Sequence, residues 1–142
     1  MSPFHQPGWA QPNGHIVRSH MEAALCDYLS AVVEPHVHGT FGVLNFDVPI
    51  GPHQKVLYIP SIALTHSQKD GRTILIEPVD SIHPGGGVRR LQGFRQSHSL
   101  EYFLIIVVAR RVLQRHIPED AYDLLISLED FPRPLDKFLA EL

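Results

Sequence analysis

The chain has 142 residues, of which 44% are apolar and 19% are charged. This length and composition fit one globular domain with a hydrophobic core and exclude a globally disordered chain. The 15 acidic residues outnumber the 12 Lys and Arg residues and give a formal net charge of -3, which excludes nucleic-acid binding by bulk positive charge but allows a local basic patch.

Hydropathy and cysteine usage exclude further classes. No apolar stretch approaches the roughly 20 residues that span a bilayer, so no membrane segment is expected. The N-terminus lacks a charged segment followed by an apolar one, so we expect no secretory signal and a cytoplasmic location. The single cysteine, Cys26, excludes an internal disulfide and a multi-cysteine zinc site.

Residues 1–14 hold three prolines and two glycines without any hydrophobic period, which predicts a flexible arm ahead of a single domain over residues 15–142. Residues 15–33 carry apolar side chains at three- and four-residue spacing, which predicts a helix. Its start is left open, because Asn13 can cap it or Ser19 can form a capping box with Glu22. Pro35 ends it.

Three strands are predicted next, over Gly39–Val48, Lys55–Leu64 and Arg72–Pro78. Their tight connections, including a hairpin loop over 65–71, predict an antiparallel meander. Pro60 lies inside the second strand and indicates an edge position or a bulge.

The second half of the chain alternates helix and strand. A helix is predicted over Val88–His98, buried strands over Tyr102–Ala109 and Tyr122–Leu128, and a short helix near the C-terminus. The strand–helix–strand unit predicts a parallel pair with a right-handed crossover. The expected fold class is therefore α/β, with a mixed central sheet flanked by helices.

This order resembles the core of the PD-(D/E)XK, or restriction-endonuclease-like, nuclease superfamily. The resemblance covers about residues 15–130 and rests on three segments: VRSHMEAALCDYL is similar to the first helix of these domains, VLYIPSIALTHSQKDGRTILIEPVDS to their active-site hairpin, and RRLQGFRQSHSLEYFLIIVV to the helix and strand that follow. It implies a restriction-endonuclease-like core, with a helix, a three-strand meander, a helix, two strands and a C-terminal helix. It also implies a Mg²⁺-dependent DNA endonuclease.

The chemistry of that family explains its motif, because phosphodiester hydrolysis needs Mg²⁺ held by carboxylates with open positions for water and phosphate. By resemblance, Glu77 occupies the acidic position that closes the hairpin, and Glu22 that of a helix-borne carboxylate. The chain departs from the motif twice. Ser61 follows Pro60 where the family has Asp, and Val79 follows Glu77 by two residues where the family has Lys. A hydroxyl is a weak Mg²⁺ ligand, and valine cannot replace an ammonium group.

The candidate catalytic residues are therefore Glu77, Glu22, Ser61 and Asp80, the candidate Mg²⁺ ligands are Glu77 and Asp80, and Asp47 or His83 are further residues for the vacant position. Ordinary alternatives exist for three of them. Glu77 can be a carboxylate at the sheet rim, Glu22 can pair with Arg18, and Ser61 can be a plain strand residue. Two function classes stay open: a divergent endonuclease, and a catalytically inactive nuclease-fold module that binds DNA or a protein.

Arg89, Arg90 and Arg95 make the second predicted helix basic. The helix would lie beside the nuclease-site position, so these side chains are predicted to contact DNA phosphates and to give weak DNA binding. A solvated helix face is the alternative. Gly85-Gly86-Gly87 ahead of this helix is interpreted as a turn rather than a phosphate cradle. A homodimer or a protein partner also stays open.

His36 and His38 would project to one face of an extended segment and could begin a zinc site that His53 or His83 completes. Polar histidines at a strand edge are the alternative. Cys26 is predicted to be a partly buried structural thiol, because only His20 and Arg18 on its own helix are assigned as basic neighbours.

Overall fold

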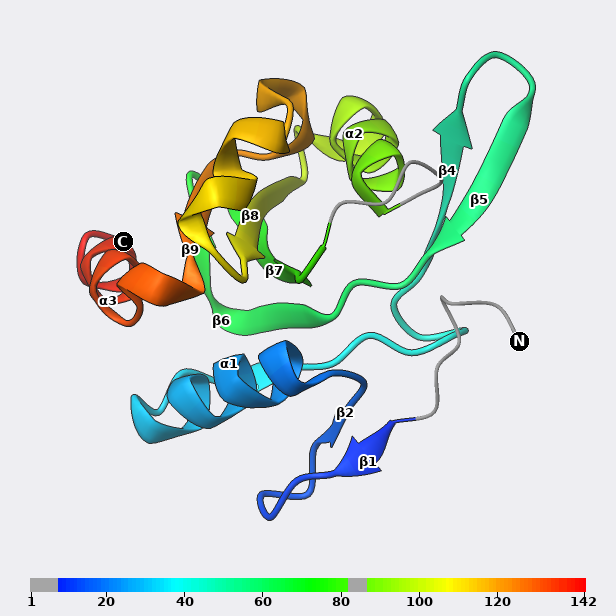
Figure 1. Cartoon of the computed structure of the whole chain (residues 1–142). Coiled ribbons are helices and arrows are strands. Elements are labelled where there is room, and N and C mark those ends of the chain that lie inside the picture. The colour runs from blue at the N-terminus through cyan, green and yellow to red at the C-terminus, as the bar shows by residue number, and fades with distance from the viewer. Residues whose placement is uncertain (1–7, 82–86) are drawn as a thin grey trace.

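The structure is a computed structural model, and it describes residues 8–81 and 87–142 (Figure 1). Its elements in chain order are β1 (Trp9–Ala10), β2 (Ile16–Val17), α1 (His20–Ala31), β3 (His36–Val37), β4 (Phe46–Ile50), β5 (Gln54–Tyr58), β6 (Ile62–Lys69), β7 (Arg72–Val79), α2 (Gly87–His98), β8 (Tyr102–Val108), the 3₁₀ turns η2 (Arg111–His116) and η3 (Glu119–Ala121), β9 (Leu124–Ser127), η4 (Leu128–Asp130) and α3 (Arg133–Ala140).

The central sheet has five strands in the order β3-β6-β7-β8-β9. β6 is antiparallel to both β3 and β7, whereas β8 is parallel to both β7 and β9. The predicted mixed α/β class is confirmed, and so is the parallel pairing of the two buried strands on either side of α2. β8 is an interior strand between β7 and β9, because an unbroken apolar run can be buried on both faces of a sheet.

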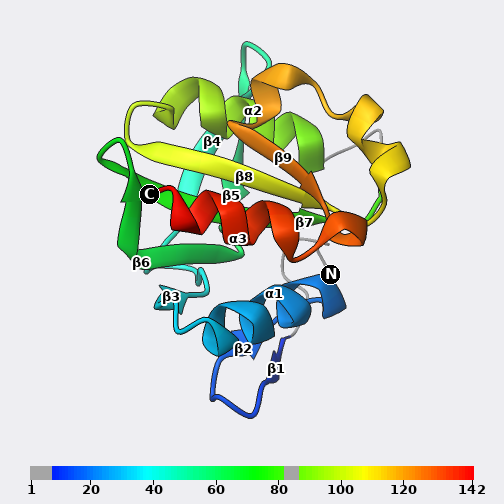
Figure 2. The same cartoon turned by 90° about the vertical axis from the view of Figure 1, so that its left-hand side faces the viewer.

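Alternation along β7 and β8 builds two cores, since successive side chains in a strand point to opposite faces. Ile74, Ile76 and Ile105 pack with α1 and α3 on one face, and Leu75 and Ile106 pack with α2 on the other. Figure 1 shows α1 and α2 on opposite sides of the sheet, and Figure 2 shows α3 in front of the sheet, running in nearly the same direction as β8.

The strands that we predicted for the three-strand meander are assigned wrongly. β4 and β5 pair only with each other, and β3 takes the outer position next to β6. Pro60, which lacks an N–H, lies between β5 and β6, so the predicted second strand is divided in two. The detached β4–β5 hairpin packs on α2, where Gly93 gives it room: a Cβ on Gly93 would lie 2.3 Å from the Pro49 carbonyl oxygen.

Residues 8–14 belong to a hairpin and not to a flexible arm, because β1 pairs with β2. Gln11 Nε2 donates to the Ala23 carbonyl at 3.2 Å and to Asp27 at 3.1 Å, so the hairpin is fastened to α1. Helix α1 begins after Ser19, whose hydroxyl accepts the Glu22 N–H at 3.0 Å. This contact decides which of the two caps suggested by the sequence is formed.

Among the described residues, no helix has both the length and the apolar character that a bilayer span requires.

Candidate functional site

Glu77 and Ser61 meet at the end of the β6–β7 hairpin. Ile62 pairs with Ile76 across the hairpin, so Ser61, just before β6, faces Glu77 near the end of β7. The Ser61 N–H donates to Glu77 Oε1 at 2.8 Å and its hydroxyl donates to Oε2 at 2.6 Å. The Tyr58 hydroxyl donates to Oε1 at 2.7 Å. Three donors therefore occupy both oxygens of the Glu77 carboxylate.

Glu22 reaches the same region from α1, and its side chain is only 1% exposed. His38 Nδ1 lies 2.7 Å from Glu22 Oε2, and Arg18 Nε lies 3.8 Å from Oε1. Arg90 extends from α2, and its guanidinium carbon lies 5.9 Å from the centre of the Tyr58 ring. Two carboxylates and two guanidinium groups thus gather around Tyr58 and Ser61.

Burial raises the pKa of Glu77 above its ordinary value. The hydrogen bonds from Ser61 and Tyr58 oppose this rise, and the negative charge of Glu22 adds to it. The pKa of Tyr58 is also raised, first by burial and then by the charge of Glu77. Arg90 has its pKa lowered by burial, although the charge of Glu77 favours the protonated guanidinium. Arg90 therefore places a positive charge near this carboxylate.

The structure gathers the predicted catalytic residues unevenly. Glu22, Ser61 and Glu77 share one region, whereas Asp80 is exposed beyond the end of β7. Within residues 8–81 and 87–142, neither Glu77 nor Asp80 belongs to a group of three or more His, Cys, Asp or Glu donors that could hold a metal. Asp47 is exposed on β4, and His83 lies outside the described residues. Mg²⁺ binding by Glu77 and Asp80 stays a prediction.

The three arginines of α2 do not share one face. Arg89 is exposed, Arg90 extends toward Tyr58, and Arg95 lies 3.1 Å from the Asp123 carboxylate. Arg95 also donates to the Asp120 carbonyl at 3.4 Å. Arg89 is therefore the α2 arginine best placed for a partner, while Arg95 serves the fold. Gly87 starts α2, and Gly85 and Gly86 lie outside the described residues.

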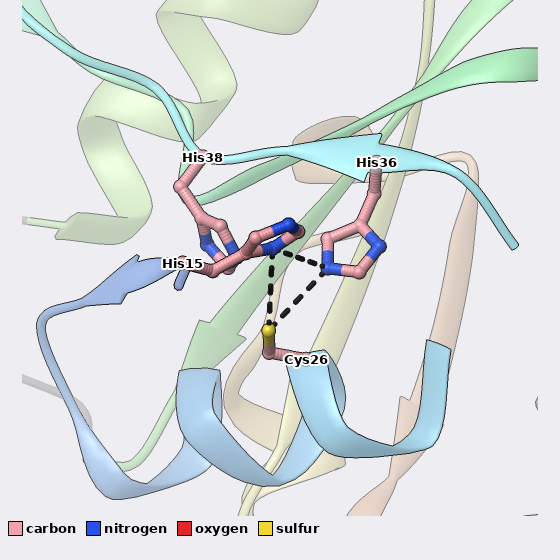
Figure 3. Close-up of side chains that lie close together, drawn as sticks. All are labelled: His15, Cys26, His36 and His38. Atoms are coloured by element: carbon pink, nitrogen blue, oxygen red, sulfur yellow. Dashed lines mark hydrogen bonds between the residues drawn. The ribbon is translucent and has the colours of Figure 1, made fainter. Parts of the chain in front are cut away.

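A second cluster lies on the other side of Glu22 and consists of His15, Cys26, His36 and His38 (Figure 3). One ring nitrogen from each histidine and the Cys26 sulfur all lie within 4.8 Å of one another. His15 Nδ1 lies 3.2 Å from both His36 Nε2 and His38 Nε2 and 3.5 Å from Cys26 Sγ. His36 Nε2 lies 3.4 Å from the sulfur. Four good metal-ligand atoms therefore converge on one point.

Three separate elements position these side chains. Cys26 lies in the middle of α1, His36 and His38 come from β3 and the residue after it, and His15 comes from the turn before β2 (Figure 3). The Asn13 side-chain oxygen accepts the His15 N–H at 2.9 Å and fixes the turn. After His38 comes Gly39, where a Cβ would lie 2.1 Å from the Pro60 carbonyl oxygen, so only glycine allows this close approach.

The sequence identified half of this cluster. His36 and His38 do point to a common centre, but His15 and Cys26 complete the group, and His53 lies exposed in the β4–β5 turn. Cys26 is fully buried rather than partly buried, and its neighbours are His15 and His36 rather than His20 and Arg18. The missed signal is Asn13-Gly14-His15, because Asn–Gly indicates a turn that brings the next residue back toward the following helix.

Burial lowers the pKa of both His15 and His36. For His15 the neighbouring His38 lowers it further, whereas for His36 the Glu34 carbonyl partly restores it. Both imidazoles are therefore neutral near pH 7, which is the form that binds metals.

Comparisons with known proteins add no relative. No protein-family model matches this chain, no curated protein matches it, and no solved structure matches it.

Proposed function

We propose that this chain is a restriction-endonuclease-like module that binds the DNA backbone without metal-dependent hydrolysis. The element order supports the fold assignment: α1, β3, β6, β7, α2 and β8 follow one another as helix, three antiparallel strands, helix and parallel strand. That is the order the resemblance implies, with the β4–β5 hairpin inserted between the first and second strands.

The observation that carries the loss of hydrolysis is the occupied carboxylate of Glu77. A Mg²⁺ ion binds through free carboxylate oxygens and keeps several waters. Here Tyr58 and Ser61 donate three hydrogen bonds to those oxygens at 2.6–2.8 Å. The charges of Arg18 and Arg90 act on the same region. An incoming cation would compete with these donors, two on Oε1 and one on Oε2, and would meet two positive charges.

One observation favours an endonuclease as the second candidate. Glu22 lies close enough for its charge to raise the pKa of Glu77. Two acidic side chains of the predicted set therefore face one region, and a rearrangement that freed them would supply two Mg²⁺ ligands. Val79 stands where the family motif has Lys, so there is no ammonium group at this position to orient the attacking water.

Binding to the DNA backbone rests on Arg89, which is exposed on α2. Arg18, which is partly exposed and lies beside Glu22, is a second positive charge. Each phosphate contact contributes about -0.9 to the slope of log affinity against log salt concentration. The net charge of -3 opposes binding away from these residues, so affinity should be weak and should fall steeply with salt.

The test combines a cleavage assay and a binding assay. Single-stranded, duplex and branched DNA are incubated with Mg²⁺ or Mn²⁺ and with the wild type or Glu77→Ala, and we expect no cleavage in any case. Fluorescence anisotropy across a salt series should show that Arg89→Ala weakens duplex binding and lowers the slope by about 1. Arg115→Ala is the control, since Arg115 is also exposed but lies on η2.

Two results would overturn this proposal. Mg²⁺-dependent cleavage that Glu77→Ala abolishes would establish the endonuclease instead. Equal binding by the wild type, Arg89→Ala and Arg115→Ala, or no binding even at low salt, would remove DNA as the partner and favour a protein partner for the module.

A further inference from the structure

We propose that His15, Cys26, His36 and His38 form a tetrahedral Zn²⁺ site in which the chain supplies all four ligands. The proposal goes beyond DNA binding and does not depend on it, because none of the four residues is among the arginines or carboxylates of the proposed DNA-binding region. It rests on the spacing of the four ligand atoms, on the groups that hold them, and on the charges beside them.

The spacing matches a tetrahedron around zinc. Zinc–nitrogen bonds of about 2.0–2.1 Å and a zinc–sulfur bond of about 2.3 Å at tetrahedral angles separate two nitrogens by about 3.3 Å and a nitrogen from the sulfur by about 3.6 Å. The two nitrogen pairs that include His15 are each 3.2 Å apart. The sulfur lies 3.4 Å from His36 Nε2 and 3.5 Å from His15 Nδ1. These four separations agree with the expected ones to within about 0.2 Å, and the two remaining pairs, His36 with His38 and His38 with Cys26, lie within 4.8 Å.

Neighbouring acceptors fix the imidazoles in the form that binds a metal. His36 Nδ1 lies 2.9 Å from the Glu34 carbonyl oxygen, and His38 Nδ1 lies 2.7 Å from the Glu22 carboxylate. An acceptor at Nδ1 places the proton of a neutral ring there, so the Nε2 atoms of His36 and His38 turn unprotonated lone pairs toward the centre. Histidine ligands of metals are commonly held by such carbonyl and carboxylate partners.

Polar and charged groups lie beside the ligands. Asn13 Nδ2 donates toward Cys26 Sγ at 3.3 Å, and cysteine binds zinc through this sulfur as a thiolate. Zinc with one thiolate and three neutral imidazoles carries a single positive charge. Glu22, which is 1% exposed, bonded to His38 and 3.8 Å from Arg18, supplies a negative charge beside the site. A buried ion therefore has a buried counter-charge at one hydrogen bond's distance.

The ligand set selects the metal and the role. One thiolate and three imidazoles suit zinc, whereas Mg²⁺ takes oxygen ligands. Four protein ligands leave no open position for water or substrate, which is the arrangement of structural zinc sites. The ion would join the turn before β2, α1 and β3, which supply His15, Cys26 and His36 with His38.

The same atoms can also form a metal-free network. The Cys26 thiol can donate to His36 Nε2, and His15 Nδ1–H can donate to His38 Nε2. The two arrangements differ in whether purified protein retains a stoichiometric metal, so metal content separates them.

The experiment measures metal in the full-length chain purified without an affinity tag. Elemental analysis should find about one zinc per chain in the wild type and in His53→Ala, the control, because His53 is exposed and outside the cluster. Cys26→Ser and His15→Ala should each lose most of it. His15 is only half-buried, so His15→Ala keeps the test valid if substitution of the fully buried Cys26 prevents folding. Circular dichroism checks the fold of each variant.

Replacement of zinc by Co²⁺ gives a second readout. The wild type and His53→Ala should show tetrahedral cobalt bands and a thiolate charge-transfer band, and Cys26→Ser should lose the charge-transfer band. A wild type without zinc that also gives no tetrahedral cobalt spectrum would overturn the proposal in favour of the metal-free network. So would zinc that Cys26→Ser and His15→Ala retain in full, and so would stoichiometric copper that zinc cannot replace.

Discussion

Replacing Ser61 with Asp restores the Pro-Asp pair of the nuclease motif and tests whether the acidic region is free to bind a cation. Ser61 is 7% exposed and its hydroxyl donates to Glu77 Oε2 at 2.6 Å. In Ser61→Asp this hydrogen bond becomes a contact between two carboxylates. At a separation of about 4 Å and an effective dielectric constant near 20, their repulsion is about 4 kcal/mol. Such a loss should lower the Tm by roughly 10 °C for a domain of this size.

Added Mg²⁺ should reverse part of that loss, because the two carboxylates of Ser61→Asp can share one ion. The measurement is thermal unfolding at pH 7.5 and constant ionic strength, with and without millimolar Mg²⁺. Ser61→Asn is the matched control, since it has the same shape without the charge. The wild type and Ser61→Asn should not respond to Mg²⁺. A wild type stabilised by Mg²⁺ as strongly as Ser61→Asp would refute the argument that Tyr58 and Ser61 already occupy Glu77.

Three further predictions follow from the same contacts. The pKa of Glu77 is raised above 4.5 in the folded chain, so the folded state binds a proton more tightly than the unfolded state does. The stability of the wild type relative to Glu77→Gln should therefore fall as pH rises from about 4.5. Urea unfolding across pH measures this difference, and a relative stability that rises with pH would contradict the prediction. Glu22→Ala should weaken zinc binding 10–100-fold, roughly 1.4–2.7 kcal/mol, because it removes the partner of His38. Competition with a chromophoric chelator measures the zinc affinity, with Asp47→Asn as the control. Equal affinities for the two variants would show that Glu22 does not support the His38 ligand. Gly93→Ala should destabilise the chain by about 1–3 kcal/mol, since its Cβ would lie 2.3 Å from the Pro49 carbonyl oxygen. Gly87→Ala is the control, because its Cβ would have nothing within 4 Å. Equal denaturation midpoints for the two variants would show that β4 moves to accommodate the added methyl group at no cost.

Local patterns predicted the elements that depend on local physics. The apolar run of β8 indicated a central strand, the positions of Val88, Leu91 and Phe94 indicated α2, and Ser19 with Glu22 gave one of two caps for α1. Each of these signals lies within a dozen residues. The structure has β8 and α2 within one residue of their expected bounds, whereas α1 begins at His20 rather than at residue 15, because residues 16–17 form β2.

The pairing of strands was harder to predict, because it depends on where a chain breaks and turns. Pro60 could be accommodated as a bulge or as a strand end, and only the packing of the β4–β5 hairpin on Gly93 decides for the second. The edge strand next to β6 is therefore β3, which has only two residues and is too short for a hydrophobic period to reveal it.

The Cys-His cluster was half predictable for a similar reason. His36 and His38 are two residues apart in extended backbone, so their common direction can be read from the sequence. His15 reaches them only because the β1–β2 hairpin folds back along α1, held by Gln11 and Asn13. Apart from the Asn13-Gly14 turn, residues 1–14 have three prolines and no apolar period and gave no sign of that return.

The coordination shell of the bound metal tests the central claim most directly. X-ray absorption at the zinc edge of the purified wild type should show three nitrogen ligands at about 2.0–2.1 Å and one sulfur at about 2.3 Å. A shell of nitrogen and oxygen ligands without sulfur would place the ion away from Cys26 and contradict the site built from His15, His36 and His38.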